Sequence, residues 1–415
     1  MFSFKTYKEK LHFSVNFYSV FLLINFIPDF LGVSGNIIKY GYWGIKLSLA
    51  WWIINKSKRS FFHFTRTETL FIIVFIIYTV NLFIDVFIAP LHRFNSTAGS
   101  VDFVGFLLII ILAFSFSYDP DFHSEKSFWF FMGSLSIGLI IAYFFAIENH
   151  KLDPFNVRYD ANSGVNSIWY GQMGCALALA SIYGFTSYKK QALKFLFFVS
   201  FLIGMLSIAK AGSRSPVVVL ALVAIFFFLA KLGELKGIII ICVLAGLLII
   251  FINPIIDLLT AMGSNLAVRL TSMFVEGETS GRDIIYKNVL DIIKQSPIVG
   301  VYYIVPSGPG AGMYPHNYFL EVFMATGFLG GAPFMILIFI SLVKSYNLIK
   351  MKHASSWIII LYLQILVYGM FSTGLYSSQD FWCLLFYLMS MKMYTKAVSP
   401  KSFPKHARLI PVNSA

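Results

Sequence analysis

The stretch from Ser280 to Gly331 begins SGRDIIYKNVLDIIKQSPIVG (280–300) and ends PHNYFLEVFMATGFLGG (315–331), with a Gly- and Pro-rich loop between them. Charged groups, an imidazole and loop-forming residues collect here, whereas the sequence on both sides is mostly apolar. Apolar residues recur at helical spacing over 283–294, which predicts a short surface helix instead of a disordered loop. The stretch therefore interrupts a series of apolar helices, and function is to be sought in it first.

The rest of the chain is too apolar for a water-soluble protein. Of its 415 residues 58% are hydrophobic and 12% are charged, whereas soluble domains carry about 25% charged residues. Folding alone cannot hide so much apolar surface from water, so lipid must cover it. The net charge of +13 is then a signal of membrane topology and does not indicate a nucleic-acid partner.

The apolar runs predict an all-α integral membrane protein with about 12 transmembrane helices, since about 20 apolar residues cross the bilayer core. The predicted spans lie near 12–30, 36–54, 68–90, 101–118, 127–147, 164–187, 191–209, 215–231, 236–253, 322–343, 357–375 and 380–395. The predicted organisation is nine spans in 1–253, one large loop with short helices in 254–321, three spans in 322–395 and a tail in 396–415.

The positive charges predict which side of the membrane each loop faces. With twelve spans both termini lie on one side, and the segments on that side hold 21 of the 32 Lys and Arg residues. The other side holds nine, and Lys39 and Lys46 fall inside the second span. The positive-inside rule places the lysine-rich side in the cytoplasm, so the 254–321 loop faces outward.

Two arginines on the predicted outer side are candidate site residues. Arg214 follows an apolar span and precedes Ser215-Pro216, a favourable helix start. Arg282 opens the helix predicted over 283–294, where free backbone N–H groups and a guanidinium together suit phosphate oxygens. The alternatives are that Arg214 reaches toward the membrane surface and that Arg282 pairs with a nearby acidic residue such as Asp283.

His316 is the candidate proton acceptor, because histidine binds and releases a proton near neutral pH. The alternative is a structural histidine that caps the helix after it. Asn317, Tyr314 and Tyr318 are candidate sugar contacts, although the tyrosines also fit an interfacial aromatic belt. Arg158, in the outer loop before the sixth span, is a candidate further phosphate contact or a partner of Asp160.

Metal and nucleotide sites are not supported by the sequence. Asp119 and Asp121 have the spacing of a metal-binding carboxylate pair, but they are predicted on the cytoplasmic side and are interpreted as a turn. No His pair at helical spacing, no His/Cys cluster and no glycine-rich phosphate loop occurs. Arginines and one imidazole without metal carboxylates suit a reaction in which a diphosphate leaves and a hydroxyl attacks.

Three motifs carry a resemblance to a known family: GSRS (212–215), SGR (280–282) and PHNY (315–318). With Pro297…Gly300 and Gly327…Gly330, their order resembles the O-antigen polymerase and O-antigen ligase superfamily, from about Arg158 to Gly331. The resemblance implies a GT-C-like membrane fold and glycan transfer without a metal or another cofactor, at the periplasmic face of the bacterial inner membrane.

In that family the donor is an oligosaccharide on undecaprenyl diphosphate. Arg214 and Arg282 would hold the diphosphate, and His316 would activate or orient the acceptor hydroxyl. A polymerase uses the end sugar of another lipid-linked repeat unit as acceptor, whereas a ligase uses the lipid A core. We favour an O-antigen polymerase, with the ligase as the alternative; candidate protein partners are a chain-length regulator and a flippase.

Two further classes of protein are the rivals. A lipid-linked sugar transporter or flippase would carry ionisable residues in mid-span, but Lys46, Asp85, Asp102 and Glu321 lie near predicted span ends or in a doubtful span. A metal-dependent GT-C transferase would need Asp119 and Asp121 on the outer face.

Overall fold

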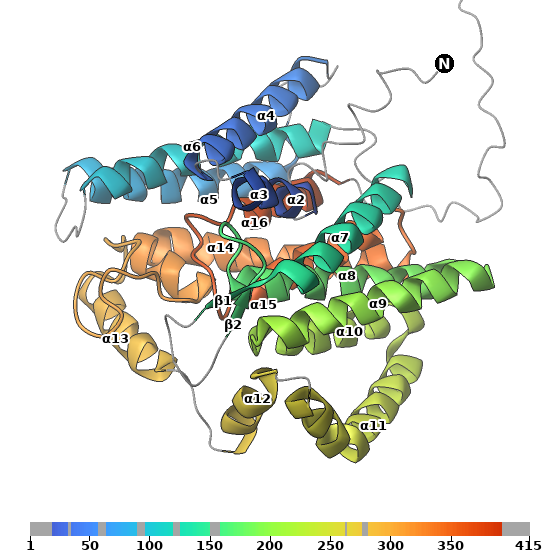
Figure 1. Cartoon of the computed structure of the whole chain (residues 1–415). Coiled ribbons are helices and arrows are strands. Elements are labelled where there is room, and N and C mark those ends of the chain that lie inside the picture. The colour runs from blue at the N-terminus through green and yellow to red at the C-terminus, as the bar shows by residue number, and fades with distance from the viewer. Residues whose placement is uncertain are drawn as a thin grey trace, which may run out of the picture.

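A computed structural model describes residues 19–31, 35–56, 64–88, 96–118, 125–149, 158–261, 264–275 and 281–391, and most of them are helical (Figure 1). The helices of the first half are α2 (Ser19–Ile24), α3 (Phe26–Leu31), α4 (Gly35–Lys56), α5 (Arg66–Phe83), η1 (Ile84–Ile88), α6 (Ser96–Tyr118), α7 (Glu125–Phe145) and α8 (Ser167–Ser187). Those of the second half are α9 (Gln191–Ala211), α10 (Ser215–Leu232), α11 (Glu234–Ala261), α12 (Leu266–Val275), α13 (Arg282–Gln295), α14 (Tyr318–Lys350), α15 (Ser356–Tyr368) and α16 (Gln379–Ser390). A short antiparallel hairpin pairs β1 (Ile147–Asn149) with β2 (Arg158–Asp160).

Six helical segments of the described residues are long and apolar enough to cross a membrane. They are Arg66–Ile88, Gly99–Tyr118, Glu125–Phe145, Gln191–Ala211, Ser215–Leu232 and Tyr318–Lys350. Large apolar side chains stay exposed on such helices, including Phe144 at 74% and Phe339 at 67%, which suits contact with lipid tails. The protein is therefore a helical membrane protein, but the predicted number of about twelve spans is not confirmed.

α8 is not in this set, and its central residues, from Tyr170 to Ser181, are all buried in the protein. It makes the most extensive helix contact of the molecule, with α9. A Cβ atom added at Gly174 would lie 2.7 Å from the carbonyl oxygen of Gly204, and one at Gly204 would lie 2.6 Å from that of Gly174. The two backbones thus meet at glycines, as small residues allow in membrane helix pairs.

The last two predicted spans, 357–375 and 380–395, are short helices in the structure. α15 has 13 residues and is about 20 Å long, whereas the hydrocarbon core is about 30 Å thick. The chain leaves α15 at Gly369, where the missing side chain makes room for the ring of Tyr318. We call the irregular segment between α15 and α16, residues 369–378, the strap.

The predicted loop 254–321 contains the helices α12 and α13, and α11 continues into it as far as Ala261. α11 and α12 lie at the edge of the bundle that is far from α5 and α6 (Figure 1). Asp119, Asp121, Ser280 and the predicted tail 396–415 lie outside the described residues. The side of the membrane that the loop faces stays a prediction.

Candidate functional site

A backbone crossing between residues 297–302 and α14 fixes the site. α14 is broken at Gly327, whose φ of 56° and ψ of −153° are not helical. The N–H of Phe328 donates to the carbonyl of Pro297 at 2.8 Å. A side chain at Gly300 or at Gly327 would overlap the facing backbone, so this crossing needs both glycines. The motifs Pro297…Gly300 and Gly327…Gly330 therefore meet in space.

The crossing aligns α13 with the first turns of α14. Val289 and Ile292 of α13 pack with Met324 of α14 in a small apolar cluster. Because α13 also ends close to the break in α14, the two helices run in the same direction and begin at the same end. Arg282 is the first residue of α13, and His316 lies just before α14.

Arg282 is half-buried at the start of α13, after Gly281 in a left-handed conformation with φ 71°. Burial lowers the pKa of Arg282, the nearby Tyr286 acts in the opposite direction, and the charge of Arg214 lowers the pKa further. The guanidinium stays protonated at neutral pH because its ordinary pKa is above about 12. The structure therefore holds the charges of Arg214 and Arg282 within electrostatic reach of each other.

Arg214 lies in the turn between α9 and α10 and is held there through α12. Its guanidinium donates to the backbone carbonyl of Arg269 at 3.3 Å. In return, the guanidinium of Arg269 donates to the carbonyl of Gly212, the residue that ends α9, at 3.1 Å. Arg269 thus positions Arg214, a role that the sequence did not predict. The sequence did contain one indication of this role, because Arg269, like Arg214, is a basic residue on the predicted outer side.

His316 has an unusual backbone and an unsatisfied ring nitrogen. Its φ of 58° is in the left-handed region, which non-glycine residues rarely adopt and which often marks functional positions. Its Nδ1 is buried without a hydrogen-bond partner among the described residues. Burial, and next the charge of Arg282, lower the pKa of His316 to about 4. The imidazole is therefore neutral at pH 7 and can accept a proton.

The strap connects the segments that hold these three residues. The Tyr286 hydroxyl, from α13, donates to the carbonyl of Met370 at 3.3 Å. The Tyr314 hydroxyl donates to the carbonyl of Ser372 at 3.4 Å, and the Ser372 hydroxyl donates to Oγ of Ser215 at 3.4 Å. Tyr314 also packs edge-on against the ring of His316, with 4.4 Å between the ring centres.

Glu321 anchors the far half of the strap. Its carboxylate is fully buried and accepts the backbone N–H groups of Leu375 at 2.7 Å and Tyr376 at 3.0 Å. It also accepts the hydroxyl of Tyr78 at 2.7 Å. The sequence did not predict this role, although a carboxylate one turn inside an apolar helix was a signal for it.

The remaining candidate residues have structural contacts of their own. Arg158 lies in β2, where it pairs with Asn149 of β1. The Asn317 side chain caps α14 by accepting from two backbone N–H groups. Tyr318 is fully buried, with its hydroxyl bonded to Ser378.

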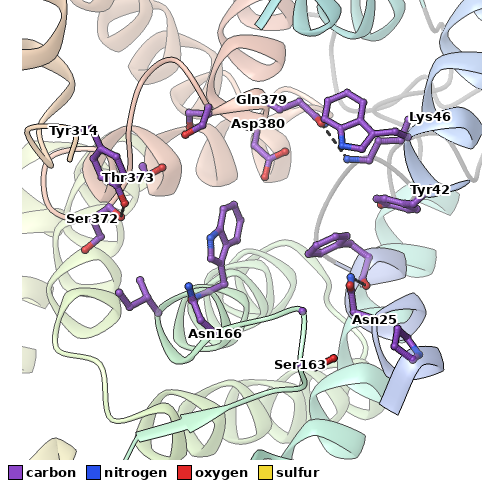
Figure 2. Close-up of a pocket in the computed structure, with 18 residues that line it drawn as sticks. Asn25, Tyr42, Lys46, Ser163, Asn166, Tyr314, Ser372, Thr373, Gln379 and Asp380 are labelled. Atoms are coloured by element: carbon purple, nitrogen blue, oxygen red, sulfur yellow. Dashed lines mark hydrogen bonds between the residues drawn. The ribbon is translucent and has the colours of Figure 1, made fainter. Parts of the chain in front are cut away.

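A cavity of about 680 Å³ adjoins the cluster, within the range of about 300–1,000 Å³ usual for ligand pockets. Tyr314, the ring neighbour of His316, lines one side with the strap residues Ser372 and Thr373, and Lys46 and Asp380 line the other (Figure 2). Of the three predicted sugar contacts, the cavity lining includes Tyr314. Elsewhere in the described part of the chain, no group of three or more His, Cys, Asp or Glu side chains is placed to hold a metal ion.

Comparison with known proteins gives one family. Residues 195–335 match the model of a family described as O-antigen ligase. The match runs from α9 into α14 and includes Arg214, Arg282, His316 and the glycine crossing. The resemblance to the O-antigen polymerase and ligase superfamily is thereby confirmed for this part of the chain. No curated protein matches the sequence.

Proposed function

We propose that this membrane protein, with its O-antigen ligase-type segment, is an O-antigen polymerase. It transfers a glycan chain from undecaprenyl diphosphate to the end sugar of another lipid-linked repeat unit, at the periplasmic face of the bacterial inner membrane, in a GT-C-like fold of about twelve spans. One observation supports this most: Arg214, Arg282 and the neutral His316 gather where α10, α13 and α14 begin.

The cationic half of the cluster suits the leaving diphosphate. The first backbone N–H groups of a helix and its dipole favour anions, and two guanidinium groups add hydrogen-bond donors matched to phosphate oxygens. Negative charge builds on the diphosphate as the glycosidic bond breaks. Fixed donors aimed at that charge stabilise the transition state, so Arg214 and Arg282 fill the role for which other transferases use a divalent cation.

His316 suits the acceptor. A bond forms between the acceptor oxygen and the anomeric carbon while the bond from that carbon to the diphosphate oxygen breaks. The acceptor proton passes to the neutral imidazole, and the electron pair of the broken bond leaves with the lipid diphosphate. Direct attack from the opposite face inverts the anomeric configuration. A general base of this kind contributes about 10²–10⁴-fold to the rate.

Deletion of the gene, followed by electrophoresis of the lipopolysaccharide, tests the proposal. A core that carries a single repeat unit is the expected result. The ligase is the second candidate, favoured by the description of the matched family, and its loss would leave long polymer on the carrier lipid. Repeat units retained on the cytoplasmic face of the membrane would instead indicate a flippase.

Complementation of the deletion strain tests the site. We expect wild-type protein to restore long chains and His316→Ala to restore none, at equal amounts of inserted protein on an immunoblot. Full-length polymer in the His316→Ala strain would remove His316 from catalysis.

A further inference from the structure

The lining of the cavity beside Tyr314 includes a side chain whose hydrogen-bond donor has no partner among the described residues. Gln379, the first residue of α16, lines the cavity and is only 8% exposed. Its Oε1 accepts from Nζ of Lys46 at 3.0 Å, whereas its Nε2 is buried without a partner. An ammonium group can only donate, so the contact with Lys46 fixes which end of the amide is the oxygen. The free end is therefore a donor that calls for an acceptor.

The charges on this side of the cavity are balanced. Lys46 interacts electrostatically with the half-buried Asp380, and its ammonium lies 4.6 Å from the ring centre of Tyr42 and 5.2 Å from that of Trp43. Because Lys46 already has these partners, it would bind a diphosphate only weakly, and the nearby carboxylate of Asp380 would repel a diphosphate. An uncharged, hydroxyl-rich ligand fits this lining better.

The rest of the lining has the chemistry of a carbohydrate site. Hydroxyl and amide groups come from the strap, from Ser163 and from Asn25, and Figure 2 shows them arranged around a common hollow. Trp43 and Trp169 add aromatic faces, which pack on the apolar face of a sugar ring while polar groups bond its hydroxyls.

We propose that this cavity binds sugar units of the acceptor glycan, with the Gln379 amide donating to a sugar oxygen. The inference rests on the proposed function, because it takes His316 as the base for the acceptor hydroxyl. Tyr314 both packs against His316 and lines the cavity, so the cavity lies one aromatic ring away from the proposed base. The diphosphate-bound sugar of the donor approaches from the arginines instead.

The test is binding of a free oligosaccharide repeat, released by mild acid from the carrier lipid of the native strain, to the full chain in lipid nanodiscs by calorimetry. Gln379→Glu keeps an acceptor for Lys46 and removes the donor, and Gln295→Glu makes the same charge change at an exposed position on α13. We expect binding about three- to tenfold weaker in Gln379→Glu and unchanged in Gln295→Glu. If Gln379→Glu is unstable to heat, Gln379→Met replaces it.

Arg282→Ala separates this inference from the proposed function. It leaves the cavity lining intact, so we expect it to bind the free repeat as the wild type does while glycan transfer falls about 10²–10³-fold. Undiminished transfer in Arg282→Ala would overturn the proposed function and leave sugar binding standing. No binding of the repeat to the wild type, or equal binding by Gln379→Glu, would overturn the cavity assignment.

Kinetics separate acceptor from donor. With each substrate varied in turn, we expect Gln379→Glu to raise KM for the acceptor about three- to tenfold and to leave KM for the lipid diphosphate donor unchanged. A rise in the donor KM alone would show that the cavity holds donor sugars and would overturn the acceptor assignment.

Discussion

The two sides of Tyr314 use buried basic residues in opposite ways. On one side Lys46 has its hydrogen-bond acceptor in Gln379, its counter-charge in Asp380 and two aromatic rings around it. On the other side Arg282 is half-buried, near the like charge of Arg214, and has no ion pair among the described residues. Burial of an unmatched charge costs free energy, so in the proposed function a bound diphosphate would offset that cost at Arg282, whereas the partners of Lys46 are all supplied by the fold.

Of the variants that test this comparison, those of Arg282 should change the rate of glycan transfer most. Arg282→Ala should lower the rate of glycan transfer about 10²–10³-fold, the usual cost of losing one transition-state donor, and should leave thermal stability equal or higher. Arg282→Lys should also be impaired, because a point charge cannot reproduce the bidentate fork. The measurements are transfer by the purified protein and its melting temperature, with exposed Arg66→Ala as the control. Normal transfer by Arg282→Ala would show that Arg282 does not contact the diphosphate.

Lys46→Met should have the opposite effect to Arg282→Ala, because it should lower the stability of the protein more than the rate of transfer. Removal of Lys46 takes the favourable charge away from Asp380 and leaves Oε1 of Gln379 without its donor, and an unsatisfied buried acceptor costs about 1–3 kcal/mol. The melting temperature should fall, and the double variant Lys46→Met/Asp380→Asn should recover part of the loss because Asp380 then carries no charge. A Lys46→Met protein as stable as the wild type would mean that the pair contributes nothing to the fold.

The same comparison shows which parts of the site could be predicted from the sequence and which could not. Arg214, Arg282 and His316 stand out because they interrupt apolar sequence on the predicted outer side, and the glycine motifs stand out because glycine permits backbone contact. The strap did not stand out, because averaging over a window of about 20 residues hides Ser372 and Thr373 between two strongly apolar runs.

The cavity could not be predicted for a different reason. Lys46 and Gln379 are 333 residues apart, and no local pattern encodes their contact. The predicted number of about twelve spans is not confirmed, in part because α15 and α16 are short helices that are apolar and buried in the protein. Hydropathy measures only how apolar a segment is, so it cannot tell a short buried helix from a membrane span.

Glu321→Gln tests whether the strap links the two sides of Tyr314. The amide keeps one acceptor oxygen and turns an NH₂ group toward a backbone N–H that it cannot bond, so we expect a loss of about 1–3 kcal/mol in stability. Transfer should slow several-fold, since Met370 and Ser372 contact both sides of the site. Gly133→Ala, at an exposed α7 position with no atom near the new methyl group, is the matched control for handling and insertion. An unchanged melting temperature would show that the strap does not depend on this anchor.

The pH dependence of kcat/KM should show the smallest effect, but it reports specifically on His316. Because the pKa of His316 is about 4, the imidazole stays neutral from pH 8 down to about 5, and kcat/KM should fall to half only near pH 4. A solvated histidine would instead lose activity as the pH falls through about 6.5.

The cause of the low pKa is testable in the inactive variant. Arg282→Ala removes one of the two causes, the arginine charge, and leaves the other, burial. The His316 pKa should therefore be higher than about 4 and still below 6.5. NMR of labelled histidines measures it, with His316→Ala to assign the signal. Lys46→Met, on the far side of Tyr314, should leave that pKa unchanged. A wild-type His316 that titrates near 6.5 would mean that the imidazole is hydrated and out of reach of the arginine charge, and the two sides of Tyr314 would no longer differ in the way proposed.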